Sequence, residues 1–410
     1  MNERPSLWRR LAGGSRLAAI PRGVWALGFV SLLMDVSSEM ILSLLPVYLV
    51  SVLGASMEAV GVVEGVAEAT ASMVKIVSGG LSDWLGRRKL LAALGYGLAA
   101  LSKPIFPLAG SVGWVTAARF IDRVGKGVRG APRDALIADI APPELRGASF
   151  GLRQALDTVG AFVGPLLAIG LMAATANNFR AVFWVAAVPG FLAVALLVAA
   201  VDEPAATGAR AKKAAASAGA PRGLGGAFWR TTAIASLFAL ARFSEAFLVL
   251  RAVGLGLPAT LAPLVFVTMN LVYALAAYPA GALSDRFDRM GVATVGFFLL
   301  IVAEATLGFA GSLAVAALGV ALWGLHLGLT QGVLSTLVAD AAPAEKRGSA
   351  FGIFNLANGA ASLAASLIAG ALWDAFGARA TFLAGAAFAA LALVGLRAWA
   401  RPRRRAALRP

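Results

Sequence analysis

Twelve apolar runs follow one another along the chain, and each is long enough to cross a lipid bilayer, which takes about 20 residues of helix. They lie at residues 24–50, 58–80, 90–110, 113–138, 148–172, 178–201, 228–252, 258–282, 291–311, 314–338, 348–373 and 376–399. Hydrophobic residues make up 59% of the chain and charged residues 14%, which is far from the composition of soluble domains. Only helices or closed barrels satisfy the backbone inside lipid. The runs therefore predict an all-α membrane protein with 12 transmembrane helices.

Basic residues are distributed unevenly along the chain. The first 23 residues contain five arginines and the segment from Arg397 onward contains six, whereas the predicted external loops hold only Arg180, Arg251 and Arg379. Basic residues favour the cytoplasmic side, so both termini are expected there. This pattern, rather than nucleic-acid binding, accounts for the net charge of +15. We expect a multi-pass protein of the cell membrane, specifically of a bacterial inner membrane.

The chain divides near its midpoint. Residues 202–227 lose the apolar pattern and are rich in Ala, Gly, Pro and basic residues, which is typical of a flexible linker. The predicted organisation is a basic cytoplasmic N-tail (1–23), a six-helix bundle (24–201), a cytoplasmic linker (202–227), a second six-helix bundle (228–399) and a basic cytoplasmic C-tail (400–410).

The two halves repeat the same signals. The segment GGLSD at 79–83 matches GALSD at 281–285 at an offset of 202, and DIAPPELRG at 139–147 matches DAAPAEKRG at 340–348 at an offset of 201. An even number of predicted spans separates the copies, so the halves have the same orientation in the membrane. The prediction is two parallel six-helix repeats with a site between them near the bilayer midplane.

The fourth apolar run contains an unusual row of basic side chains. At helical spacing these residues share one broad stripe: Arg119, Arg123, Lys126, Arg129 and Arg133. Charges facing lipid would each cost a few kcal/mol, so the stripe is expected to face protein or water inside the bundle. It either lines an internal cavity or forms salt bridges that only join helices.

Several motifs give the chain a resemblance to the major facilitator superfamily of transporters. Residues 79–89, GGLSDWLGRRK, resemble the signature loop between the second and third spans of that family, and Arg119 stands where its fourth-span arginine is usually found. The second copy of the loop departs from the pattern because Asp288 replaces the glycine. The resemblance implies a conformational latch formed by Gly79, Asp83, Gly86, Arg87, Arg88 and Asp285. The charged loop could also be a simple stop signal.

The segment from Gly160 to Gly164 and Pro165 is similar to a motif of the 12-span drug/proton antiporter branch, although Ala168 replaces an expected glycine. The resemblance implies proton-coupled efflux. The same small residues could serve only as a helix-packing motif, because glycines four apart let helices approach closely.

Acidic residues inside the first-half spans are candidates for proton coupling. They are Asp35, Glu39, Glu64, Glu68 and Asp157. An unpaired buried carboxylate can hold a proton and release it when an arginine approaches. Permanent ion pairs between helices are the alternative for each residue. The candidates for binding substrate are Arg119, Arg123, Lys126, Arg153, Asn355 and Asn358.

These features predict a secondary transporter of a small, anionic or zwitterionic solute, with proton-coupled efflux by alternating access as the leading hypothesis. A proton symporter or facilitator that imports a metabolite, and a non-transporting membrane receptor, are the alternatives. The sequence has no cysteine and no GxSxG, HExxH or P-loop motif, so we expect no enzyme activity, no cofactor and no metal site. The expected partners are the solute, protons and lipid, but no nucleic acid, and we expect a monomer.

Overall fold

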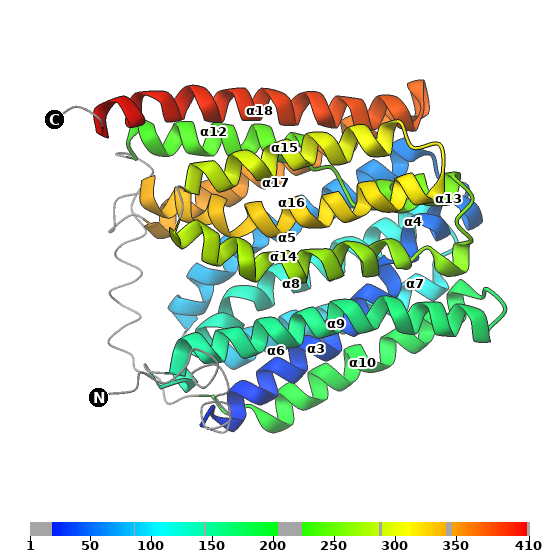
Figure 1. The fold of residues 1–410 in the computed structure, drawn as a ribbon. Helices are drawn as coiled ribbons and strands as arrows, with labels where there is room; N and C mark the ends of the chain where they lie inside the picture. Colours follow the sequence, from blue (N-terminus) through cyan, green and yellow to red (C-terminus); the bar gives the residue numbers. More distant parts are fainter. Residues whose placement is uncertain are drawn as a thin grey trace, which may run out of the picture.

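The computed structural model describes residues 19–85, 87–142, 145–203, 224–286, 289–341 and 347–407, and all regular elements in these ranges are helices (Figure 1). The first half contains α3 (Arg22–Leu42), α4 (Leu45–Val47), the π-helical turn η1 (Tyr48–Val52), α5 (Met57–Leu85), α6 (Arg88–Ser102), α7 (Ile105–Leu108), α8 (Val112–Ile140), α9 (Arg146–Ala174) and α10 (Phe179–Ala200). The second half contains α12 (Gly226–Ala241), α13 (Ala246–Gly254), the 3-10 turn η3 (Ala259–Leu261), α14 (Leu264–Arg286), α15 (Arg289–Gly308), α16 (Leu313–Ala341), α17 (Arg347–Phe376) and α18 (Ala378–Ala407).

Each predicted apolar run coincides with one helix or with a helix interrupted by a short break. In the described part of the chain, 10 of these segments are long and apolar enough to cross a membrane. The other two are α5 and α8, each 29 residues long. These two helices hold Glu64, Glu68, Lys75 and the basic stripe, and their charge keeps them below the apolarity of the rest. A multi-pass membrane protein is therefore confirmed, and the count of twelve spans stays a prediction.

The boundaries of the predicted tails and linker differ slightly from the helix ends. The first described helix begins at Arg22, within the predicted N-tail, and α12 begins at Gly226, within the predicted linker. At the other end α18 continues to Ala407, so most of the predicted C-tail is helical. Most of the linker, residues 204–223, lies outside the described residues.

Equivalent helices pack in the same way in both halves. In the first half α5 and α6 pack on α8, and α3 packs on α9 and α10; in the second half α14 and α15 pack on α16, and α12 packs on α17 and α18. Between the halves, α5 packs on α17 and α9 packs on α14, which again are equivalent pairs. This arrangement agrees with two six-helix repeats related by an approximate twofold axis.

The halves meet at the end of the bundle that lies away from the start of α3 and the end of α18 (Figure 1). There Val47 of the first half belongs to the apolar cluster of the second, and Ala246 and Leu250 of the second half belong to a cluster of the first. The Asp374 carboxylate at the end of α17 accepts hydrogen bonds from the backbone N–H groups of Met57 (3.0 Å) and Glu58 (2.7 Å). Asp374 therefore caps α5 from the other half.

Asp374→Ala is expected to weaken this junction. Loss of a carboxylate cap costs about 0.5–2 kcal/mol, which corresponds to a shift of roughly 2-fold to 30-fold in the equilibrium between joined and separated ends. Because the chain has no cysteine, spin labels at Val52→Cys and Phe376→Cys can report the separation by pulsed electron resonance. Glu58→Gln, at an exposed carboxylate of the same end, is the control. An unchanged distance distribution in Asp374→Ala would contradict the capping role.

Candidate functional site

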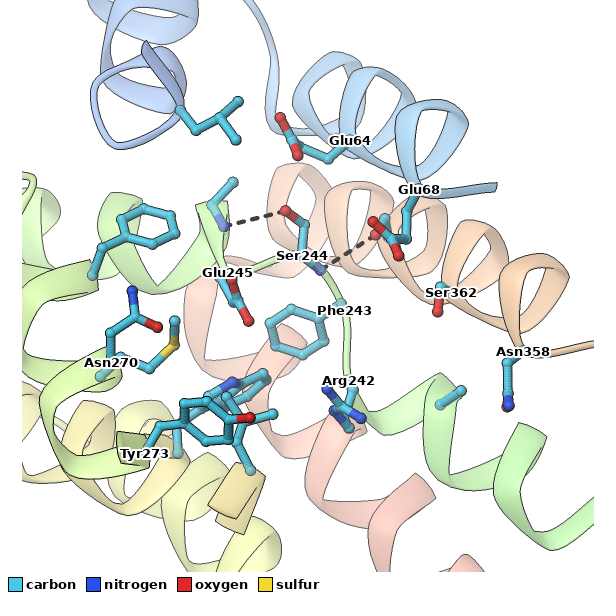
Figure 2. A pocket seen from close by; sticks show the side chains of 18 of the residues that line it. Glu64, Glu68, Arg242, Phe243, Ser244, Glu245, Asn270, Tyr273, Asn358 and Ser362 are labelled. Carbon is cyan, nitrogen blue, oxygen red and sulfur yellow. Dashed lines mark hydrogen bonds between the residues drawn. The ribbon is translucent and has the colours of Figure 1, made fainter. Parts of the chain in front are cut away.

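A cavity of about 560 Å³ lies between the two halves. Its first-half wall consists of Glu39, Leu42, Pro46, Glu64, Glu68, Arg119, Arg123, Lys126 and Ala161. Its second-half wall consists of Ala235, Phe238, Ala239, Arg242, Phe243, Ser244, Glu245, Ala246, Phe266, Met269, Asn270, Tyr273, Trp323, Leu327, Phe354, Asn358, Ser362 and Ser366. Figure 2 shows Glu64 and Glu68 on one side of this space and Asn270 and Tyr273 on the opposite side.

A break in the seventh predicted span forms part of the second-half wall. α12 ends at Ala241 and α13 begins at Ala246, and the non-helical residues 242–245 all line the cavity. The Ser244 N–H donates to the Ser366 hydroxyl (3.3 Å), and the Ala246 N–H donates to the Ser244 hydroxyl (3.2 Å) (Figure 2). Irregular backbone at membrane depth is tolerated where it lines a cavity. The sequence predicts an unbroken span here, because residues 242–245 contain no glycine or proline.

The basic stripe of α8 faces internal cavities. Arg119, Arg123 and Lys126 line the cavity described above. Lys126, Arg129 and Arg133 line a second pocket of about 350 Å³, together with Asp35, Glu68, Ala71, Ser72, Lys75, Gly127, Gly130, Arg153, Asp157 and Asn355. Lys126 and Glu68 border both spaces. All residues predicted to bind substrate or protons therefore line one of the two pockets, and their roles remain predictions.

A buried ion-pair network holds Arg119 and Arg123 of the stripe in place. The Asp122 carboxylate accepts from Lys103 Nζ (2.8 Å) and lies 3.2 Å from Arg123 Nη2 and 4.0 Å from Arg119 Nη1. Asp122 is only 2% exposed and Lys103 only 1% exposed. Lys103 Nζ also donates to the Ser38 hydroxyl (2.9 Å). Asp122 is therefore the common anion of three buried cations.

The sequence does not identify this network. Asp122 stands inside the basic stripe without a pattern that distinguishes it, and Lys103 precedes Pro104, which suggests only a kink in the third span. The structure does contain the kink, because α6 ends at Ser102 and α7 begins at Ile105. A pairing between the side chain of Lys103, in the break between α6 and α7, and that of Asp122 on α8 leaves no trace in helical periodicity.

The five acidic candidates fall into two groups. Arg119 Nη2 lies 2.5 Å from Glu64 Oε2, and Arg153 Nη1 lies 2.9 Å from Asp157 Oδ2. In contrast, Asp35, Glu39 and Glu68 line the pockets and form no ion pair within the described part of the chain. The paired acids fit the structural alternative better, and proton coupling by the three others stays a prediction.

The second half contributes two predicted residues and a set that the sequence does not single out. Asn358 lines the main cavity and Asn355 the second pocket, so the two α17 asparagines face different spaces. Six aromatic side chains line the main cavity, and all come from this half: Phe238, Phe243, Phe266, Tyr273, Trp323 and Phe354. In an apolar span such residues look like ordinary core, so only the fold reveals them as a wall.

Small residues bring α9 against α3 beside the unpaired acids. A Cβ atom added to Gly160 would lie 2.7 Å from the Leu32 carbonyl oxygen, and one added to Gly164 would lie 2.8 Å from the Glu39 Cβ. Pro165 follows inside α9. The motif therefore determines how closely α9 approaches the segment that holds Asp35 and Glu39.

Gly160→Ala is expected to destabilise the protein by about 1–3 kcal/mol, because overpacking forces helices apart. Gly170→Ala is the matched control, since the same helix has open space at that glycine. Thermal unfolding of purified protein, followed by size-exclusion fluorescence, measures both. Equal melting temperatures for the two variants would show that the close approach is unimportant.

The predicted latch is only partly visible. Gly86 and the side chains of Asp83 and Asp285 lie outside the described residues, as does side-chain detail around Gly79. Arg87 is exposed at the start of α6. Arg88 donates to the Ala135 carbonyl (3.2 Å) and pairs with Asp139, which ties α6 to the end of α8.

Comparisons with known proteins agree with this geometry. A model of the Major Facilitator Superfamily matches residues 27–261 and 232–410. An uncharacterised MFS-type transporter of Methanocaldococcus jannaschii is 33% identical over 384 residues, which are 90% of this chain and 93% of that protein. An uncharacterised protein of Mycobacterium tuberculosis is 32% identical over 365 residues, covering 86% of this chain and 87% of that protein.

The fold is also similar to that of a bacterial homologue of the human lysosomal transporter Spinster, in an inward-facing and occupied conformation. The TM-score is 0.77 at 16% identity, and the match covers 92% of this chain and 96% of that chain.

Proposed function

Because the chain belongs to the major facilitator superfamily of transporters, we propose that it exports a small anionic or zwitterionic solute in exchange for protons. The observation that carries this proposal is the cavity between the halves, which is lined by three residues of the basic stripe and by carboxylates that form no ion pair within the described residues. Charges at membrane depth that face a cavity are a common feature of transport pathways.

Alternating access would follow from the way the halves contact each other. The apolar clusters and the Asp374 cap join the halves at one end. With cytoplasmic termini, as the basic residues predict, this is the outer end, so the state would face inward. Rocking of the halves would break the outer contacts and form new ones at the inner end, with Arg88 and the predicted latch nearby.

Proton coupling would use the unpaired acids. Asp35 and Glu39 lie on α3, which packs on α9, and Glu68 borders both pockets. Each of these acids shares a pocket with Lys126. Binding of an anionic solute and binding of protons by these carboxylates would thus alter one shared electrostatic field. Glu245, on the break beside Arg242, lines the same cavity and is a fourth candidate.

Transport in reconstituted liposomes tests the proposal. A thermal-shift screen of purified protein against organic anions, sugars and antibiotics first selects a compound that stabilises it. Efflux predicts that an imposed proton gradient drives this compound in the direction opposite to protons. Movement in the same direction as protons would instead support symport, and absence of movement in either direction would support a receptor.

A further inference from the structure

The two walls of the main cavity differ in chemistry, and from this difference we infer the substrate class: an aromatic organic anion whose charged group lies against the first half and whose ring lies against the second. This inference rests on the proposed function because it treats the cavity as the substrate site. Beyond that function, it specifies which molecules the cavity binds and which half of the protein contacts each part of them.

The contrast between the walls is large. Of the nine first-half residues, six are charged and none is aromatic; of the 18 second-half residues, six are aromatic and two are charged. A small inorganic anion would leave the aromatic wall in contact with water. A molecule with an apolar body next to a charged group can contact both walls. Ligand pockets generally bind the apolar part through hydrophobic and aromatic side chains and use a few polar groups to fix its orientation.

The aromatic wall is held rigidly by rings behind it. Phe238 stacks on Phe297 with 3.7 Å between centroids and an interplanar angle of 3°. Phe243 lies on the break between α12 and α13. The centroid of its ring is 5.7 Å from that of Trp323 and 5.5 Å from that of Phe382. Aromatic rings prefer offset or edge-to-face neighbours with centroids about 4.5–7 Å apart, as those around Phe243 are. A ligand ring would therefore meet a preformed surface, which reduces the entropy lost on binding.

The charged group would be anionic because basic side chains outnumber acidic ones, eight to six, among the residues that line the two pockets together. Arg119 and Arg123 are paired with Glu64 and Asp122. Lys126 borders both pockets and has no ion pair within the described residues. In the second pocket five basic side chains face three acidic ones. The carboxylates of Glu39, Glu68 and Glu245 line the main cavity and form no ion pair within the described residues, and they are those that the proposed function assigns to protons.

Three probes separate the contribution of the aromatic ring to binding from that of the negative charge. Naphthalene-1-sulfonate carries both ring and anion, methanesulfonate carries only the anion, and 1-naphthyltrimethylammonium carries the ring with the opposite charge. Calorimetric titration of the protein in lipid nanodiscs, with empty nanodiscs subtracted, gives each Kd. We expect naphthalene-1-sulfonate to bind at least 10-fold more tightly than either other probe.

Substitutions test what each wall contributes to binding. Phe243→Leu, which keeps an apolar side chain but removes the ring, is expected to weaken naphthalene-1-sulfonate at least 5-fold and to leave methanesulfonate within 2-fold. Lys126→Gln is expected to weaken both sulfonates. Phe298→Ala, at an exposed ring of α15, is the control and should change neither. Size-exclusion profiles confirm that the variants are folded.

Equal affinity for the two sulfonates, tighter binding of the cation, or an unchanged Kd in Phe243→Leu would each overturn the inference. The outcome for transport is separate. If naphthalene-1-sulfonate binds with the expected pattern but does not move in liposomes under a proton gradient, the substrate chemistry of the cavity holds and the proposed function fails.

Discussion

Asp122→Asn is expected to be the most destabilising single substitution in the first half, lowering stability by about 3–5 kcal/mol. The reason is that removal of one partner from a buried ion pair leaves the other charges without compensation. Here the remaining cations are three, Lys103, Arg119 and Arg123, and only Arg119 has a further acidic partner, Glu64, within 4.0 Å among the described residues. Thermal unfolding and the yield of monodisperse protein in detergent measure the effect.

Asp134→Asn is the matched control on the same helix. Its carboxylate pairs with Arg133 (3.0 Å) and Arg153 (3.9 Å), but its side chain is 40% exposed. Partly exposed pairs contribute about 0–1 kcal/mol. Similar melting temperatures for the two variants would mean that Asp122 is not the common counter-ion. Restoration of stability by combining Asp122→Asn with Lys103→Met would support the pairing.

Glu39→Gln is expected to abolish accumulation of a transported compound driven by a proton gradient, reducing it to the level of protein-free liposomes, while exchange of the same compound across the membrane continues. A glutamine fills the same volume and forms hydrogen bonds but does not bind or release a proton. Glu39 lines the cavity and has no ion pair within the described residues, so its replacement leaves no cation unpaired and the fold is expected to survive.

Glu58→Gln, at an exposed carboxylate near the Asp374 cap, provides the comparison for the same assay. Persistence of proton-driven accumulation in Glu39→Gln would remove this residue from the coupling path and direct attention to Asp35 and Glu68. Loss of both accumulation and exchange would indicate a role in binding the solute rather than in coupling.

Much of the fold follows from the sequence because the bilayer restricts what the chain can form. Lipid demands continuous helices of about 20 residues, and apolar runs of that length are visible without any knowledge of packing. The repeated loop signals, GGLSD with GALSD and DIAPPELRG with DAAPAEKRG, likewise disclose the two halves. The predicted membership of the major facilitator superfamily is confirmed, whereas the antiporter branch stays a prediction.

The site is predictable only where charge marks it. Arg119, Arg123 and Lys126 are conspicuous because charged residues are rare in apolar spans, and the structure places them on the cavity. The aromatic wall and the break at 242–245 are not visible in this way. Phenylalanine and tryptophan suit lipid, core and ligand alike, and a helix break made of Arg, Phe, Ser and Glu depends on contacts such as that with Ser366.

The α5–α17 contact between the halves is built from glycine. A Cβ atom at Gly61 would collide with the Ser366 carbonyl oxygen, one at Gly65 would lie 3.1 Å from the Leu363 carbonyl oxygen, and one at Gly370 would lie 2.5 Å from the Met57 carbonyl oxygen. Interlocked side chains would have to withdraw from one another before these helices could change their angle. Along this stretch the backbones lie against each other, so apart from the Asp374 cap few side chains have to separate, and the two helices could rotate against each other here if the halves rock.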